Sequence, residues 1–363
     1  MLRPGPTRAK LYSIGIVLLI LVAGVVGFWQ IFQPRYTFPR SERDYYQKDP
    51  ILGHRHRPYA MRVFPWPEHP RGKIVMRTNN LGLRSDRDME LRKAENSVRI
   101  LIVGDSHMDG VVYNEESLST SIEQMLNKAA PVRRIETLNV AAGYYGPDEY
   151  LACMTAYDHL EPDHLLVGFY SGNDFLDAAK RVEGQAKGGM TRPWSYKAKL
   201  RKAQRIHDGA VAQILNQAFY FKSFPHMKPH VLDRVERIFQ DMHRNASLIR
   251  KTLAVLIIPT KWDLEQSRIG AEFFGAAEAL GLVHEDLNIA SRMSSELSRR
   301  LISAGICILT PSAETLRSSS PLFWERDYHL NATGHRLLAQ LSVSILLTQL
   351  STENGYPGPA PQD

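Results

Sequence analysis

Five short apolar runs, each bounded by turn residues, recur along the chain after residue 96. They are VRILIVG (98–104), IETLNVA (135–141), HLLVGFY (164–170), LAVLIIP (253–259) and GICILT (305–310). Segments with helical spacing of apolar residues lie between and after them, at 117–128, 147–159, 231–250, 284–303 and 331–349. Continuous apolar strands that alternate with helices are typical of a parallel sheet covered on both faces. The sequence therefore predicts an α/β domain built on a five-stranded parallel sheet.

The N-terminal region has a different character. No charged residue occurs from Leu11 to Pro34, which exceeds the roughly 20 apolar residues needed to cross a bilayer. The apolar region is longer than that of a cleaved signal peptide, and no Ala-x-Ala-like site follows it. We therefore predict a basic flank at 1–10 and an uncleaved transmembrane anchor at 11–33, with the N-terminus inside and the main body outside.

The rest of the chain divides by composition. Residues 34–96 are rich in Pro, Arg, His and aromatic residues with poor periodicity, which predicts a stalk and an irregular preface. The main domain is expected at 97–350 and a disordered tail at 351–363. A basic, aromatic insertion at about 175–230 interrupts the alternation. It has two interpretations, as a cover over the strand ends where α/β proteins bind ligands or as a solvated excursion.

Composition indicates a globular protein and argues against a nucleic-acid partner and a metal site. An apolar content of 44% with 9% aromatic residues is enough to form a core. The net charge of +7 is scattered along the chain and no nucleic-acid motif accompanies it, so we expect no nucleic-acid partner. Cys153 and Cys307 lie in apolar patterns typical of buried thiols, and no Cys/His spacing suits a metal. We expect neither a metal nor an organic cofactor.

Polar residues follow the predicted strands at four places. The first strand runs into Gly104-Asp105-Ser106-His107, the second into Ala141-Ala142-Gly143 and the third into Gly172-Asn173-Asp174, and ERDYHL (325–330) precedes the last helix. Alone, a serine at a strand-to-helix turn is more often a helix cap than a catalyst. Together, these residues supply every part needed for acyl transfer.

Acyl transfer by serine needs an imidazole base, a partner that orients the base, and donors for the oxyanion. Ser106 fits the nucleophile, His329 the base and Asp327 its partner. The amides of Ser106 and Gly143, with the Asn173 side chain, fit the oxyanion donors.

The motifs GDSH, NVAAG, GND and DYHLN resemble, in order, the four conserved blocks of the SGNH (GDSL-type) hydrolase superfamily, over roughly residues 96–350. The resemblance implies a three-layer α/β/α, flavodoxin-like domain and the same roles for these residues. LGLR (81–84) and GYYGPDEY (143–150) are similar to membrane-anchored bacterial members associated with cell-envelope polysaccharides. That similarity implies an inner-membrane protein with a periplasmic or extracellular catalytic domain.

Two positions depart from the family pattern. The family usually has Asp three residues before His, where this chain has Arg326, and Asp327 stands only two before His329. The Asp-x-His spacing resembles that of some alginate-type O-acetyltransferases. In the glycine block, an ungapped match from Asn139 places Tyr144 rather than Gly143 at the oxyanion position.

Other polar residues have simpler interpretations. Asn173 also suits a cap after its strand, and Asn331 suits the N-cap of the last helix. We expect His335 to be a packing or surface residue and Asp105 to buttress its turn. His107 is either a substrate contact or an ordinary loop residue.

The sequence thus predicts a membrane-anchored serine esterase that acts on ester bonds, such as O-acetyl groups of envelope carbohydrate. One alternative is an O-acyltransferase of an envelope or exopolysaccharide, because water and a sugar hydroxyl use the same machinery. Another is a catalytically silent component of an envelope assembly. Aromatic and Arg side chains of the insertion suit an anionic polysaccharide partner.

Overall fold

The computed structural model describes residues 42–129, 133–185, 192–312, 314–316 and 318–354. The chain divides into the units Met1–Arg43 and Asp44–Asp363, and the described residues begin with α2 (Glu42–Tyr45). The predicted anchor at 11–33 and its basic flank lie outside the described residues. Among the residues that are described, no helix is both long and apolar enough to span a bilayer.

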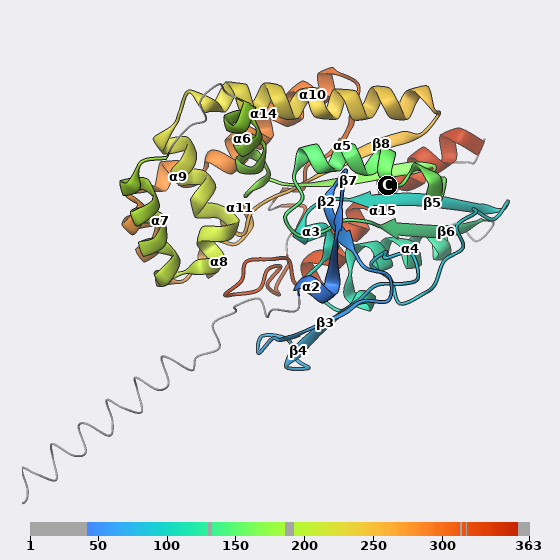
Figure 1. Ribbon diagram of the computed structural model, residues 1–363, viewed down its shortest axis with the longest axis horizontal. Helices are drawn as coiled ribbons and strands as arrows, with labels where there is room; N and C mark the ends of the chain where they lie inside the picture. Colours follow the sequence, from blue (N-terminus) through green and yellow to red (C-terminus); the bar gives the residue numbers. More distant parts are fainter. Residues whose placement is uncertain (1–41, 130–132, 186–191, 313, 317, 355–363) are drawn as a thin grey trace, which may run out of the picture. The chain divides into compact units, whose positions relative to one another are not determined.

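A five-stranded parallel sheet forms the centre of the second unit (Figure 1), which confirms the predicted fold class. Its strand order is β6-β5-β7-β8-β9. The strands are β5 (Ser97–Val103), β6 (Arg134–Asn139), β7 (His164–Tyr170), β8 (Thr252–Ile258) and β9 (Cys307–Leu309). After β5 the chain forms β6 on one side of it and then β7 on the other side. The direction in which strands are added therefore reverses between β5 and β7. Ligands of open α/β sheets bind outside the carboxyl ends of the strands at such a point.

Helices cover both faces of this sheet. Ile100 and Ile102 of β5 pack with α4 (Leu118–Ala129) and α15 (Ala332–Asn354). Leu101 and Val103 point to the opposite face, which is covered by α5 (Pro147–Ala156), α6 (Asp174–Gln185), α10 (Met227–Leu248) and α14 (Ile289–Ser303). Figure 1 shows α5 and α10 on one side of the sheet and α4 on the other. Burial on both faces explains why the strands are continuous apolar runs.

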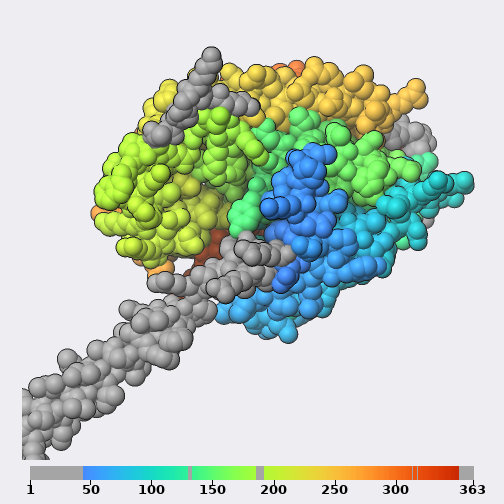
Figure 2. Space-filling model, viewed as in Figure 1, coloured from blue at the N-terminus to red at the C-terminus, as the bar shows by residue number. Residues whose placement is uncertain are grey.

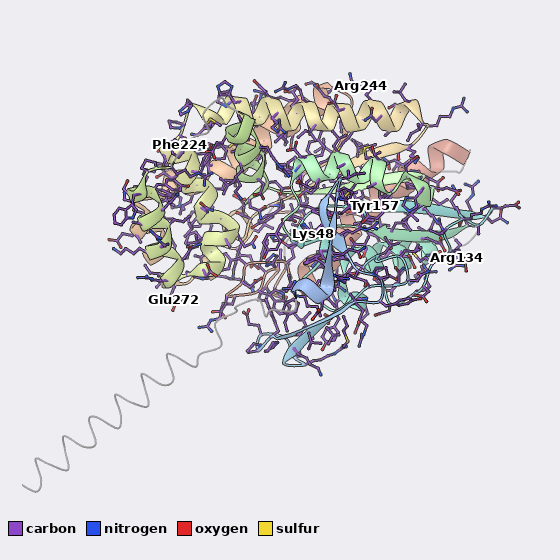
Figure 3. The ribbon with its side chains drawn as sticks, in the orientation of Figure 1. Lys48, Arg134, Tyr157, Phe224, Arg244 and Glu272 are labelled. Carbon is purple, nitrogen blue, oxygen red and sulfur yellow. The ribbon has the colours of Figure 1, made fainter. Side chains whose placement is uncertain are left out.

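The insertion is largely helical. It contains α7 (Trp194–Ile206), α8 (Asp208–Ala210), a π-helical turn (Val211–Leu215) and α9 (Asn216–Ser223). These elements pack with α12 (Ala271–Leu280) and α13 (His284–Leu287), and the rings of Tyr196 and Phe219 stack with centroids 4.4 Å apart. Figure 3 labels Phe224 and Glu272 in this region. Its buried aromatic residues show that the insertion has a packed core and is not simply a solvated excursion.

The preface that the sequence predicted to be irregular contains two antiparallel hairpins. Strands β1 (Tyr46–Asp49) and β2 (Gly53–His56) form the first hairpin, and β3 (Met61–Pro65) and β4 (Lys73–Arg77) form the second. The remaining short helices are α3 (Ser106–Asp109) and α11 (Lys261–Leu264). Strands of four or five residues carry too little periodicity to stand out in a sequence. The first hairpin lies beside the residues described next.

Candidate active site

Ser106 is the first residue of α3, directly beyond the carboxyl end of β5. The N-cap of this helix is Asp105, whose side chain accepts a hydrogen bond of 2.8 Å from the His107 amide. Asp105 therefore buttresses the turn, as expected, and the Ser106 hydroxyl is not needed as a cap. The Ser106 Oγ lies 2.8 Å from Nε2 of His329.

Asp327 reaches His329 across one intervening residue. Its Oδ1 bonds to the imidazole Nδ1 and also accepts the His329 backbone N–H at 3.1 Å. Tyr328, between them, is buried and has a φ of 68°. This left-handed conformation, uncommon for a bulky residue, turns the chain so that the carboxylate folds back onto the ring. The short Asp-x-His spacing is thus compatible with a hydrogen-bonded line of Ser106, His329 and Asp327.

The environment of His329 favours its protonated form. Burial alone lowers the pKa of the imidazole, but the charge and hydrogen bond of Asp327, aided by Asp105 and Asp109, outweigh it and raise the pKa above 6.5. Because Nδ1–H is directed to Asp327, Nε2 carries the lone pair that faces Ser106. A raised pKa makes this imidazole a stronger proton acceptor than a free one.

The raised pKa predicts a pH dependence. Nε2 must be unprotonated to take the Ser106 proton. The value of kcat/KM should therefore fall as the pH drops through the pKa of His329, which is raised above 6.5. A pH–rate profile with p-nitrophenyl acetate measures this limb. In the Asp327→Asn variant, which lacks the negative charge, the residual kcat/KM should reach its half-maximal value at a lower pH. A wild-type midpoint at or below 6.5 would contradict the assignment.

Gly143 lies against the nucleophile. A Cβ added at Gly143 would be 4.0 Å from Cβ of Ser106 and 3.2 Å from Oη of Tyr46. Tyr144, the alternative position, has a φ of 70° and a largely exposed side chain. Of the two positions, the structure places Gly143 against Ser106.

Asn173 immediately precedes α6, and its carbonyl accepts the Asp177 amide at 3.0 Å. Its side chain hydrogen bonds to Asp105 instead of capping the helix. Burial raises the pKa of Asp105, while the His107 amide, the charge of His329 and the Asn173 side chain act against that rise. Asn173 thus lies next to the turn that carries Ser106, at the end of β7.

The other histidines near the turn are packing residues. His335 is fully buried, its Nδ1 accepts the Leu118 amide at 3.2 Å, and burial lowers its pKa to about 3. His107 is also buried, and its ring stacks on Tyr170 with centroids 3.6 Å apart.

Asn331 is the N-cap of α15, as expected, because its Oδ1 accepts the backbone amides of Thr333 and Gly334 at 2.9 and 3.1 Å.

Gln213 also contacts His329, although no sequence motif indicates it. It lies in the π-helical turn of the insertion, with Nε2 3.3 Å from His329 Nε2 and Oε1 3.1 Å from His107 Nε2. Such turns occur often at functional sites. No motif surrounds Gln213 in the sequence, so only the packing of the insertion reveals it.

Three residues, Lys261, Glu68 and Gly209, hold the loop that carries Asp327 and His329. Nζ of the buried Lys261 donates to the carbonyls of Trp324 and Glu325 at 3.2 and 3.4 Å. The Glu68 carboxylate, after β3, accepts the amides of Glu325 and Arg326. Gly209 of the insertion packs directly against this loop, and a Cβ added at Gly209 would lie 2.1 Å from the backbone carbonyl oxygen of Arg326. The preface and the insertion therefore both position the catalytic loop.

We expect Gly209→Ala to lower kcat by roughly 10²-fold, because moving a reacting group by about 1 Å has an effect of that size. The new methyl group must displace the backbone of Arg326 and Asp327. Gly184→Ala is the matched control, since nothing lies within 4 Å of its Cβ position in α6. Equal kcat values for the two variants would show that the loop tolerates the displacement.

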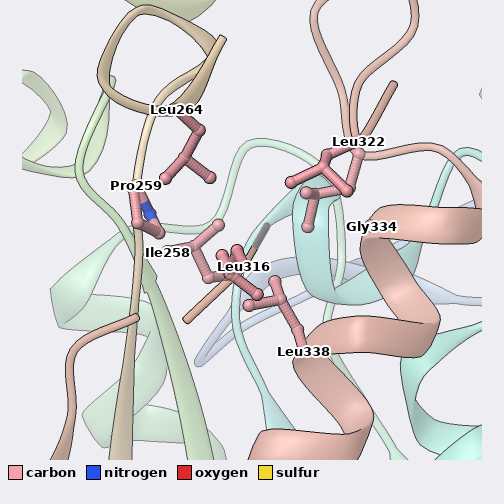
Figure 4. Close-up of a pocket in the computed structure, with 8 residues that line it drawn as sticks. Ile258, Pro259, Leu264, Leu316, Leu322, Gly334 and Leu338 are labelled. Atoms are coloured by element: carbon pink, nitrogen blue, oxygen red, sulfur yellow. The ribbon is translucent and has the colours of Figure 1, made fainter. Parts of the chain in front are cut away.

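The described part of the chain holds no group of three or more His, Cys, Asp or Glu residues arranged to bind a metal ion. Figure 4 shows an apolar pocket between β8, the catalytic loop and α15. It is lined by Ile258, Pro259, Leu264, Leu316, Leu322, Leu330, Gly334 and Leu338. Because Ser106, His329 and Asp327 do not line it, we regard it as part of the core.

No family model and no curated protein matches the chain. Among solved structures, a catalytic mutant of Axe2, an acetylxylan esterase from Geobacillus stearothermophilus, is 12% identical over 75% of this chain and 100% of that chain, with a TM-score of 0.41. The esterase EstA from Pseudoalteromonas sp. is 12% identical over 71% and 100%, with a TM-score of 0.40. LAE5, an alpha/beta hydrolase from the metagenome of Lake Arreo, Spain, is 14% identical over 70% and 96%, with a TM-score of 0.38. These values are low, so the function rests on the side-chain geometry.

Proposed function

We propose that the chain is a serine esterase of the SGNH hydrolase type, with Ser106 as nucleophile, His329 as general base and Asp327 as its partner. The observation that carries this proposal is the hydrogen-bonded line from Ser106 Oγ through His329 to Asp327. It lies at the carboxyl end of β5, where the strand order reverses. The order β6-β5-β7-β8-β9 is the flavodoxin-like one, which supports the family assignment.

In the first half of the reaction, Ser106 Oγ attacks the ester carbonyl and its proton passes to Nε2 of His329. The C–O bond forms as the carbonyl π electrons move to oxygen, and the amides of Ser106 and Gly143 with the Asn173 side chain donate to that oxyanion. The intermediate collapses, the ester C–O bond breaks, and His329 returns the proton to the leaving alkoxide. Water then attacks the acyl-enzyme with His329 as base, which releases the acid and restores Ser106.

The substrate class that we favour is an acylated, anionic carbohydrate of the cell envelope. The exposed face of α7 supports this choice, because it presents Lys197, Lys199, Arg201, Lys202 and Arg205. Trp194 at the start of the same helix is 77% exposed, and aromatic faces stack on sugar rings. This helix is part of the insertion that also positions the catalytic loop.

Residues 11–33 serve in this proposal as a single membrane anchor, with the catalytic domain on the periplasmic or outer side near the polysaccharide machinery. The uncharged stretch from Leu11 to Pro34 supports it. A reporter fused after Asp363 that is active only in the cytoplasm would contradict this orientation.

The function is tested with the full-length protein in detergent. Acetate release from p-nitrophenyl acetate and from an acetylated acidic oligosaccharide is measured in water, and acetyl transfer is measured with an unmodified oligosaccharide as acceptor. Release to water that depends on Ser106 supports an esterase. Transfer that exceeds release would indicate an O-acyltransferase, and the absence of both would indicate a silent domain.

A further inference from the structure

The first N-terminal hairpin contacts the active site through one peptide. In β1–β2, Tyr46 pairs with His56, and His54 lies two residues earlier on the same strand as His56. Nε2 of His54 lies 2.8 Å from the Gly143 carbonyl, and the Gly143 backbone N–H donates a hydrogen bond to the Tyr46 hydroxyl oxygen. The hairpin therefore contacts both polar sides of the residue that lies against Ser106.

The Tyr46 ring is held firmly. It stacks on His56 with centroids 5.0 Å apart and an interplanar angle of 21°, and it meets His54 edge-on at 4.9 Å. Nε2 of His56 lies 3.3 Å from the Asp109 carboxylate of α3, the helix that begins with Ser106. The Tyr145 hydroxyl donates to the His54 carbonyl at 2.6 Å. Strand β2 is thus tied to α3, which carries the nucleophile, and to the loop after β6, which carries Gly143.

The surface view is consistent with this contact. In Figure 2 the hairpin, coloured blue, lies on one side of a hollow, and the yellow-green helices of the insertion lie on the other. Figure 3 labels Lys48 on this hairpin. The hairpin belongs to the preface, about ninety residues before Gly143, and therefore contributes to the site from outside the α/β domain.

We propose that Tyr46 is a catalytic residue whose hydroxyl donates a hydrogen bond to the oxyanion formed on Ser106. The inference rests on the proposed esterase function. When Ser106 Oγ bonds to the acyl carbon, the carbonyl π pair moves to oxygen and the Oγ proton moves to His329. In the resting structure the Gly143 amide donates to the Tyr46 oxygen, which leaves the Tyr46 O–H as the proton that can be donated to the charged oxygen beside Gly143 and Ser106.

The chemistry of the hydroxyl suits a donor. Oη of Tyr46 lies 3.2 Å from the Cβ position of Gly143, which is itself 4.0 Å from Cβ of Ser106. Burial first, and then the charge of Asp109, raise the pKa of Tyr46 well above 10, so its proton stays in place at neutral pH. A donor fixed before the reaction stabilises developing charge without reorganisation.

Tyr46→Phe removes only the hydroxyl, and Tyr45→Phe is the matched control. Tyr45 is the preceding residue and is fully buried, and its hydroxyl has no hydrogen-bond partner among the described residues. With p-nitrophenyl acetate, we expect Tyr46→Phe to lower kcat by roughly 10²- to 10³-fold with little change in KM, because loss of one oxyanion donor acts on the transition state. Tyr45→Phe should keep the wild-type kcat.

Three results would overturn the inference. Wild-type kcat in Tyr46→Phe would show that the hydroxyl donates nothing to the oxyanion, and a higher kcat would show that it blocks the site. Equal losses in Tyr46→Phe and Tyr45→Phe, together with equal falls in melting temperature, would indicate a packing role. Failure of the proposed function is distinguishable, because the wild-type protein itself would then neither hydrolyse the ester nor react with a fluorophosphonate.

Discussion

Ser106→Ala is expected to lower kcat for ester hydrolysis by on the order of 10⁵- to 10⁶-fold. The hydroxyl that lies 2.8 Å from Nε2 of His329 is then absent, and no acyl-enzyme can form. His329→Ala should cost about as much, because the two residues act as one unit, and the double variant should lose little more than either. Steady-state rates with p-nitrophenyl acetate measure all three.

Ser303→Ala is the matched control for this series. Ser303 is the last residue of α14, is exposed, and leads toward the amino end of β9, at the edge of the sheet opposite the catalytic residues. Its replacement should leave kcat unchanged. If Ser106→Ala retained more than a small fraction of wild-type kcat, another nucleophile would have to be sought.

Asp327→Asn is expected to lower kcat by about 10⁴-fold. The asparagine side chain at position 327 carries no charge to stabilise the imidazolium form of His329. It also favours the imidazole tautomer in which Nε2 carries the proton, and this tautomer cannot accept a proton from Ser106. The rate should be compared over a range of pH values, because the pKa of His329 falls when the charge of Asp327 is removed.

Asp208→Asn provides the control for a change of charge. Asp208 lies at the start of α8. Burial raises the pKa of Asp208, and the nearby charge of Asp327 raises it further. Asp208 makes no contact with His329 among the described interactions. We expect this variant to change kcat by only a few-fold. A similar loss in both variants would mean that local charge, and not the bond to Nδ1, accounts for the effect.

The sheet could be predicted because its strands are buried on both faces and each one reads as a continuous apolar run. Leu101 and Ile102 of β5, for example, belong to cores on opposite sides of the sheet. The positions of Ser106, Gly143 and Asn173 follow from that prediction, since the ends of parallel strands meet at one edge. Their roles, and that of Asp327, stay predictions until the variants are measured.

The particular residues that the hairpin and the insertion contribute to the site could not be predicted. Tyr46 stands in a four-residue strand with the sequence YQKD, whose pattern carries no signal of burial or pairing. Gln213 reaches His329 only because a π-helical turn and the close approach of Gly209 to Arg326 bring the insertion to the catalytic loop. The left-handed φ of Tyr328 is likewise not indicated by its residue type, because bulky residues seldom adopt that conformation.

The most direct test of the central claim is the site at which a fluorophosphonate probe reacts with the full-length protein. The phosphonyl group bonds only to an activated hydroxyl, so peptide mapping by mass spectrometry should find the adduct on Ser106. The adduct should be absent in Ser106→Ala and in His329→Ala and present in Ser303→Ala. An unlabelled wild-type protein, or an adduct on any other residue, would contradict the assignment of Ser106 as the nucleophile.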